Sequence, residues 1–102
     1  PVQRLTIGGG IGKITKLAQG AIDLHSGRSQ VDFDKLADWA DDVRVVQANT
    51  ALEAYEIAGK LLAERVAKEA AVQAALQFRE NVPILDVVII DRAGNIIGQA
   101  TH

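Results

Sequence analysis

The amino-acid sequence predicts an α/β fold in which helices cover a small sheet. Three observations predict it: a short apolar segment near the start of the chain, an alanine-rich middle with helical spacing, and two short apolar segments close together near the end. The predicted order is strand, helices, strand, strand. Helices packed on one small sheet are the economical way to bury the apolar side chains of such elements.

The first predicted strand runs into a glycine-rich turn. The apolar residues Val2, Leu5 and Ile7, in a short segment with β-branched residues at its end, predict a strand over about 2–7. We expect the sequence Gly8-Gly9-Gly10-Ile11-Gly12 to end it. Apolar residues then recur at helical spacing, which predicts a helix over about 11–19: Ile11, Ile14, Leu17 and Ala18. Gly20 is a suitable C-terminal stop for this helix.

The middle of the chain carries three further predicted helices. Asp32 is placed to cap a helix over about 32–41. Thr50 and Glu53 have the spacing of a capping box, which predicts a helix over about 50–58 that Gly59 interrupts. A longer helix over about 61–79 has these buried candidates: Leu62, Val66, Ala70 and Leu76. We expect 43–48, between the helices, to be helical or irregular.

The end of the chain reads as a hairpin. The segment ILDVVII predicts a strand over about 84–90, and its nearly continuous apolar character predicts burial on both faces. A turn at 91–94 leads into a strand over about 95–100. A three-stranded sheet has open edges, which fits missing upstream strands or a homo-oligomeric partner. We expect a Rossmann-like fragment of a larger domain, with 1–102 forming either a single domain or a C-terminal segment.

Composition excludes several classes of protein. The chain has 102 residues, a net charge of −2 and few aromatic residues, which argues against nucleic-acid binding. It has no cysteine and only two histidines, so we expect no metal site. No apolar segment reaches membrane-spanning length, and we expect a soluble intracellular protein. The sequence starts at Pro1 and lacks methionine, from which we expect a fragment, although a processed small protein would look the same.

The glycine-rich turn and the segment after it are the candidate binding site. Glycines at a helix start leave backbone N–H groups open, and the helix dipole adds positive potential there. Lysines three residues apart share a helical face, and a polar loop follows. The candidate substrate- or cofactor-binding residues are Gly8, Gly9, Gly10, Gly12, Lys13, Lys16, His25, Ser26 and Arg28. The glycines could equally serve only to turn the chain, with the lysines in solvent.

Motif tests leave the chemistry of this segment open. The Walker phosphate loop and the G-x-G-x-x-G fingerprint both fail, because Ile14 and Lys13 stand where the patterns need other residues. Gly8, Gly10 and Gly12 fit the strand–G-x-G-x-G–helix pattern of many S-adenosylmethionine-dependent methyltransferases, which is a fold-level analogy. No catalytic residue can be assigned from the sequence.

The segment GGGIGKITKLAQGAIDLHSGRSQVDF resembles the C-terminal part of the CbiD family, the cobalt-precorrin-5B C1-methyltransferases of anaerobic cobalamin biosynthesis. The resemblance is carried by Gly12-Lys13, Lys16-Leu17-Ala18, Gly20, His25-Ser26 and Asp32, and the closing ILDVVIIDRAGNIIG also fits. The chain departs from the commoner family form at Leu24 and in the spacing after Ser26.

The resemblance implies the C-terminal region of a cytoplasmic enzyme that transfers a methyl group from S-adenosylmethionine to C1 of cobalt-precorrin-5B. The implied partners are an anionic corrinoid precursor, whose carboxylates suit Lys13, Lys16 and Arg28, and the N-terminal domain of the same enzyme. The resemblance does not decide whether the glycine turn holds the methyl donor or the corrinoid. The alternative is a non-catalytic module for small-ligand binding or assembly. An isolated fragment of the enzyme should be inactive.

Overall fold

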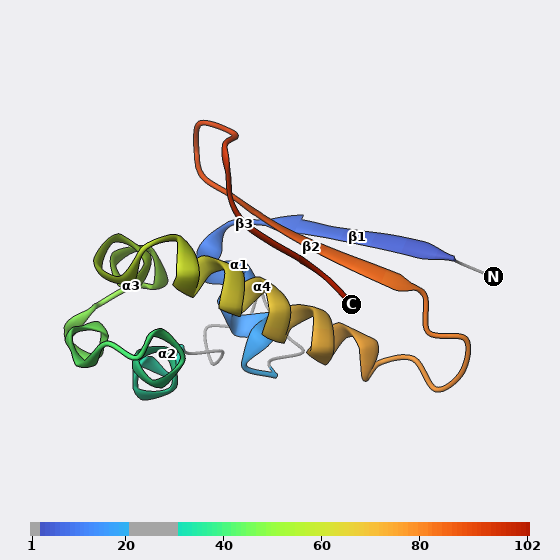
Figure 1. The fold of residues 1–102 in the computed structure, drawn as a ribbon, viewed down its shortest axis with the longest axis horizontal. Coiled ribbons are helices and arrows are strands. Elements are labelled where there is room, and N and C mark those ends of the chain that lie inside the picture. The colour runs from blue at the N-terminus through green and yellow to red at the C-terminus, as the bar shows by residue number, and fades with distance from the viewer. Residues whose placement is uncertain (1–2, 21–30) are drawn as a thin grey trace.

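The structure, a computed structural model, describes residues 3–20 and 31–102. Within these ranges it has the following elements: β1 (Arg4–Gly9), α1 (Ile11–Ala18), α2 (Phe33–Ala40), the 3-10 helix η1 (Val43–Gln47), α3 (Ala51–Ala58), α4 (Lys60–Ala75), β2 (Ile84–Ile90) and β3 (Ile96–Thr101) (Figure 1). The α/β class is confirmed, and most of the segment 43–48, expected to be helical or irregular, forms the 3-10 helix η1. None of the helices in the described ranges is long and apolar enough to cross a bilayer.

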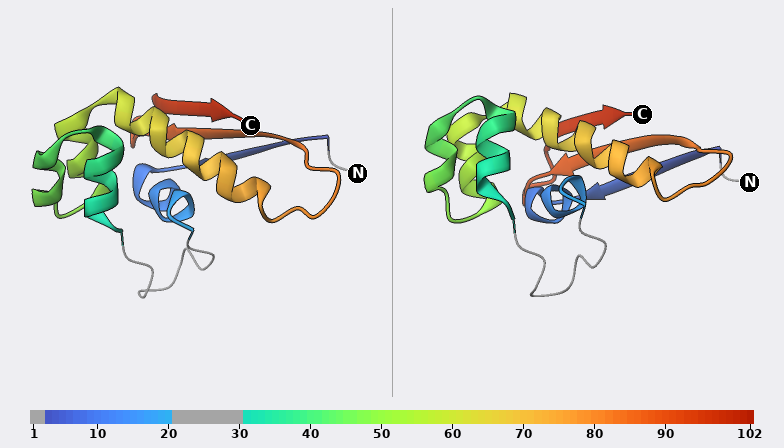
Figure 2. Two further views of the ribbon diagram at one scale, coloured as in Figure 1. Left: turned by 60° about the horizontal axis from the view of Figure 1, so that its bottom comes forward. Right: turned by 90° about the horizontal axis from the view of Figure 1, so that it is seen from below.

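The three strands form one mixed sheet in the order β1-β2-β3. β1 and β2 are parallel, in a register that runs from Arg4 opposite Ile84 to Gly9 opposite Ile89. β2 and β3 are antiparallel, which confirms the hairpin, and a register shift at Ile89/Ile90 marks a bulge between them. The helices lie on one side of this sheet, as the views of Figures 1 and 2 show.

The first strand lies further along the chain than the sequence predicts. β1 continues through Gly8 and Gly9, which pair with Val88 and Ile89 of β2. The expectation that the glycine run ends the strand is therefore wrong. Glycine weakens a strand but does not forbid one, and the parallel pairing with β2 holds these residues extended. α1 begins only at Ile11, after Gly10 as its N-cap.

Only one face of β2 is buried, which corrects the prediction of burial on both faces. Leu85, Val87 and Ile89 are completely buried against the helical layer. On the opposite face, Ile84 and Ile90 are 48% and 40% exposed. In the part of the chain that the structure describes, α4 and its neighbours supply a single covering layer, so the apolar character of β2 alone overstates its burial.

The predicted helix starts are confirmed. The carboxylate of Asp32 accepts a hydrogen bond from the Lys35 N–H at 3.1 Å. The Thr50 hydroxyl accepts from the Glu53 N–H at 3.1 Å, and the Glu53 carboxylate accepts from the Asn49 N–H at 2.9 Å. In the usual capping box the carboxylate returns to the cap residue itself, so this one reaches one residue further back.

The long helix ends earlier than predicted. α4 stops at Ala75, and Leu76, expected in the core, is 69% exposed. After the helix, the Gln77 and Phe78 N–H groups donate to carbonyls only three residues back, at Ala74 and Ala75. This is the tighter 3-10 hydrogen-bond pattern in which α-helices often end. The other buried candidates on this helix are confirmed: Leu62, Val66 and Ala70.

α4 packs closely on the hairpin because two small residues meet there. A Cβ atom added at Gly98 of β3 would lie only 2.7–2.8 Å from atoms of Ala63 on α4. Both residues are buried. The close contact between Gly98 and Ala63 sets the distance between α4 and the sheet. α1 packs against α4 as well.

Candidate functional site

The candidate site lies where the two parallel strands end. β1 ends at Gly9 and β2 at Ile90, and the carboxyl ends of parallel strands meet at one edge of a sheet. In open α/β sheets, ligands bind in the crevice outside this edge. α1 starts immediately after β1, and α3 contacts α1. The first turns of these two helices border two clefts.

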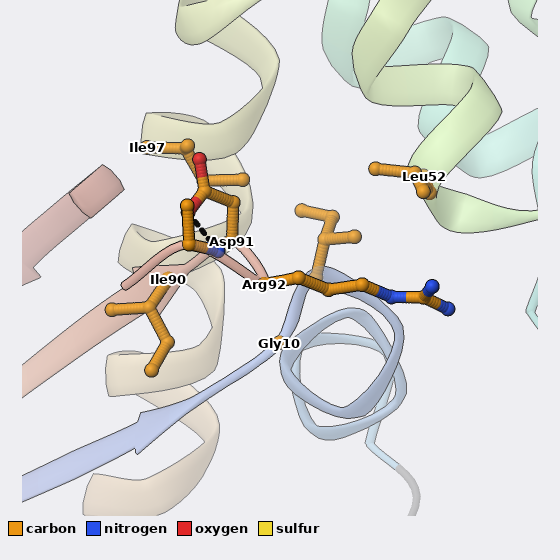
Figure 3. Close-up of a pocket in the computed structure, with 8 residues that line it drawn as sticks. Gly10, Leu52, Ile90, Asp91, Arg92 and Ile97 are labelled. Atoms are coloured by element: carbon orange, nitrogen blue, oxygen red, sulfur yellow. Dashed lines mark hydrogen bonds between the residues drawn. The ribbon is translucent and has the colours of Figure 1, made fainter. Parts of the chain in front are cut away.

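The first of them, which we call the apolar cleft, has a volume of about 400 Å³. It is lined by Gly10, Ile11, Leu52, Ile90, Asp91, Arg92, Ala93 and Ile97 (Figure 3). Four of these side chains are large and aliphatic, which suits an apolar body of a ligand. Figure 3 shows the Arg92 side chain directed away from Asp91, on the side of the cleft where Leu52 lies.

Asp91 shapes the turn that carries Arg92. Its carboxylate accepts hydrogen bonds from the Ala93 and Asn95 backbone N–H groups at 2.9 and 2.8 Å, and from the Asn95 side chain. These bonds, led by the one from the Asn95 backbone, lower the pKa of Asp91 below its ordinary value. Asp91 is therefore committed to the turn, and no carboxylate in the described residues forms an ion pair with Arg92.

The second, which we call the lysine cleft, has a volume of about 460 Å³. It is lined by Gly12, Lys16, Val31, Phe33, Asn49, Thr50 and Ala51. It brings the first turn of α1 together with the start of α3. Lys16 is its cationic group, and within residues 3–20 and 31–102 it has no ion-pair partner.

The start of α1 differs from the starts of α2 and α3. Asp32 and Thr50 cap those two helices with side-chain oxygens, and each has an acidic residue in its first turn. α1 has Gly10 as its N-cap, no side-chain cap and no acidic residue in its first turn. Among residues 3–20 and 31–102, no capping side chain or first-turn carboxylate therefore occupies its first N–H groups and the positive end of its dipole, which suit an anionic ligand.

The structure distributes the predicted site residues over several places. Gly8 and Gly9 belong to β1, Gly10 lines the apolar cleft, and Gly12 and Lys16 line the lysine cleft. Lys13 lines neither cleft, and its stem lies near Gly9, 3.2 Å from the place of an added Cβ. The remaining predicted residues lie outside the described part of the chain: His25, Ser26 and Arg28.

Sequence reasoning missed Arg92, Leu52 and Ile97 as residues of the apolar cleft. A signal for Arg92 was present, because it lies two residues after the end of the most apolar strand and so had to lie near the end of β1 if the strands were parallel. Leu52 and Ile97 look like ordinary core residues, and only the packing places them here.

A third hollow, of about 650 Å³, lies on the open face of the sheet around Asp86. The charged side chains that line it are already paired with one another. Arg4 donates to Asp86 from Nε at 2.7 Å and from Nη2 at 2.9 Å, and the Thr101 hydroxyl donates at 2.7 Å. Arg4 first, and Thr101 next, lower the pKa of Asp86 to about 2. No metal-binding group of three or more His, Asp or Glu residues occurs in the described ranges.

The fold and the two clefts together define an α/β segment suited to a ligand that has an apolar body and negatively charged groups. Comparison with known proteins gives the family. Residues 23–101 match the model described as CbiD, C-terminal domain, and the chain belongs to this family.

Named relatives agree with this assignment. Proteins from Brucella ovis, Brucella canis and Brucella abortus, each named cobalt-precorrin-5B C(1)-methyltransferase, are 41% identical over 97% of this chain. The match covers 30% of each relative's length, so the chain spans about a third of these proteins. No solved structure matches the chain, and the Rossmann-like description stays a prediction.

Proposed function

We propose that this chain is the C-terminal part of an enzyme that methylates C1 of cobalt-precorrin-5B in anaerobic cobalamin biosynthesis, in the cytoplasm. The observation that carries the proposal is the 41% identity over 97% of the chain to proteins of that name. The alternative of a module without a link to catalysis is not favoured, because every relative named above is a methyltransferase.

The two clefts fit the substrate of this reaction better than its methyl donor. A corrinoid precursor combines an apolar macrocycle with several carboxylate side chains. Ile11, Leu52 and Ile97 offer apolar contact, while Lys16 and Arg92 offer charge-assisted hydrogen bonds from either side of the first turn of α1. We therefore assign the clefts to one edge of the corrinoid.

S-adenosylmethionine, the methyl donor predicted from the resemblance, fits the described residues poorly. Its sulfonium and ammonium groups are cationic, and the cation Arg92 faces the same apolar cleft. Asp91, the carboxylate lining that cleft, is committed to hydrogen bonds within its own turn. We therefore assign none of the described residues a role in binding or activating the methyl donor.

The role of this chain is then to position the acceptor. Methyl transfer to carbon depends largely on holding the donor and acceptor atoms in line. Contacts to carboxylates at the macrocycle rim fix the orientation of the ring without taking part in bond making. Lys16 and Arg92 are positioning residues in this account.

The test uses the full-length enzyme that contains this chain. Incubation with cobalt-precorrin-5B and S-adenosylmethionine carrying a ¹³C-labelled methyl group should give a product labelled at C1, detected by NMR. Label at another ring carbon, or no transfer by an enzyme that binds the corrinoid, would contradict the proposal. Unlabelled C1 methylation would show that the donor is a different compound.

A further inference from the structure

We propose that β1 is an interior strand in the complete enzyme, and that a strand from the remainder of the enzyme pairs with its outer edge. In the described residues β1 has one neighbour, β2, and its other edge is open. Strand addition at an open edge is an established mode of association. The inference concerns the architecture of the enzyme and does not depend on the proposed reaction.

The sheet contains residues on both sides of the point where the family match begins. The C-terminal domain match begins at residue 23, whereas β1 comprises Arg4–Gly9. β1 nevertheless pairs with β2 over six consecutive positions, and β2 lies well inside the matched domain. Residues before the domain boundary thus already contribute a strand to this sheet. A further strand from the part of the enzyme before residue 23 would extend this sheet in the same way that β1 does.

The open edge of β1 lacks the features that protect natural edge strands. Such edges usually carry several charged side chains, especially lysine, or a proline or a bulge. β1 has the sequence RLTIGG, and its register with β2 is uninterrupted. Its charged residue, Arg4, is turned toward β2 by its bonds to Asp86. The hairpin, by contrast, has a bulge beside β3 at Ile89/Ile90.

The unpaired backbone groups on this edge can be named. In a parallel pair, alternate residues of a strand direct both N–H and C=O toward the same neighbour. Gln3 accepts from the Ile84 N–H at 2.9 Å, so Leu5, Ile7 and Gly9 continue the series that faces β2. The N–H and C=O groups of Arg4, Thr6 and Gly8 therefore point outward, where a further strand can bond to them.

The helical layer covers β1 only in part: α1 reaches the end of the strand, where Gly9 lies beside Ile14. α4 packs on β2 and β3, with no comparable contact to β1 among the described elements. Leu5, on the helix-facing side of β1, is 37% exposed, whereas its neighbour Leu85 in β2 is fully buried. The apolar side of β1 is thus incompletely covered, as expected where a sheet and its covering layer continue beyond it.

The remainder of the enzyme is a better occupant of this edge than a second copy. The relatives carry most of their length outside the matched 30%. A strand tethered in the same polypeptide has a high effective concentration at the edge, which a second molecule lacks. A second copy of the chain is an outcome that the experiment must distinguish.

Hydrogen exchange on the full-length enzyme, resolved to single residues, tests the inference. The amides of Leu5 and Ile7 bond to β2 and serve as internal references. We expect the amides of Arg4, Thr6 and Gly8 to exchange within about tenfold of the references at every protein concentration. Exchange of these three at the rate of free peptide, with the references protected, would overturn the inference. Protection that is lost when a dimer dissociates on dilution would overturn it as well.

Proline variants give a second measurement. Thr6→Pro removes an outward N–H without touching the bonds to β2. Gln99→Pro does the same on the outer edge of β3: Leu85 and His102 exchange both backbone bonds, so in this register the N–H of Gln99 points away from β2. Thr6→Val controls for the hydroxyl, which donates to Asp86 at 3.3 Å. We expect Thr6→Pro to lower the unfolding temperature of the full-length enzyme clearly more than Gln99→Pro or Thr6→Val. Equal effects of the two proline variants would contradict the inference.

Discussion

Arg4 of β1 and Asp86 of β2 form a two-point ion pair across the open face of the sheet, with Nε to Oδ2 at 2.7 Å and Nη2 to Oδ1 at 2.9 Å. The pair joins residues 82 positions apart in the sequence. Thr101 of β3 donates to the same carboxylate, so one side chain on the central strand links all three strands.

This ion pair predicts a dependence of stability on pH. The folded-state pKa of Asp86, about 2, lies below its ordinary value of 3.8, mainly because of Arg4. Ionised Asp86 therefore contributes stability that is complete above about pH 4 and is lost as the pH falls toward about 2. Urea unfolding at several pH values should show this loss, and Asp86→Asn should reduce it.

Titration of the Asp86 carboxyl carbon by NMR gives the direct check of this prediction. Arg4→Gln should move the pKa of Asp86 up toward 3.8. A wild-type pKa already at the ordinary value would show that the ion pair is not held in solution.

Thr15 of α1 has a buried hydroxyl without a hydrogen-bond partner in the described structure. Replacing it by a methyl group keeps the shape and removes the cost of an unpaired polar atom. Thr15→Val should raise the free energy of unfolding by about 1 kcal/mol. The matched change Thr50→Val removes a hydroxyl that caps α3 and should lower it by about 1 kcal/mol. Loss of stability in both variants would show that Thr15 has a partner in solution.

Gly98 and Gly12 should respond oppositely to replacement by alanine. At Gly98 the new Cβ would lie 2.7 Å from the backbone carbon of Ala63, so α4 must move, and we expect a loss of about 1–3 kcal/mol in the free energy of unfolding. At Gly12, inside α1, no atom of the neighbouring described residues lies within 4 Å of the new Cβ, and we expect a gain of about 0.5–1 kcal/mol. Thermal unfolding of both variants checks the pair, and a neutral Gly98→Ala would refute the close packing.

The sequence was sufficient for those features that depend on local chemistry. Asp32 and Thr50 cap helices where their spacing predicts, Gly59 separates α3 from α4, and the hairpin at the end of the chain is present. These outcomes depend on hydrogen bonds and backbone preferences within a few residues of each other, which a sequence displays directly.

Features that depend on pairing between distant segments were not predictable in this way. Gly8 and Gly9 look like a turn, and only their partners in β2 hold them in a strand. Ile84 and Ile90 look buried, but the helices cover the other face. Arg92 comes to the start of α1 through the parallel register of β1 and β2, which no local pattern encodes.

The two cations beside α1 should act independently of one another, because they line different clefts. Lys16→Gln and Arg92→Gln should each weaken binding of an anionic ligand, and the two effects should be additive in free energy. Rising salt should weaken binding to the wild type more than binding to the double variant. Strong non-additivity would indicate that both cations contact one carboxylate.

The central claim is that the clefts on either side of the first turn of α1 hold the anionic corrinoid. Calorimetric titration of the full-length enzyme with cobalt-precorrin-5B tests it most directly, using Lys16→Gln and Arg92→Gln, with Lys68→Gln on the exposed side of α4 as the matched control. We expect the dissociation constant to rise by about tenfold for each cleft variant and to stay unchanged for Lys68→Gln. Unchanged dissociation constants in both cleft variants would contradict the claim.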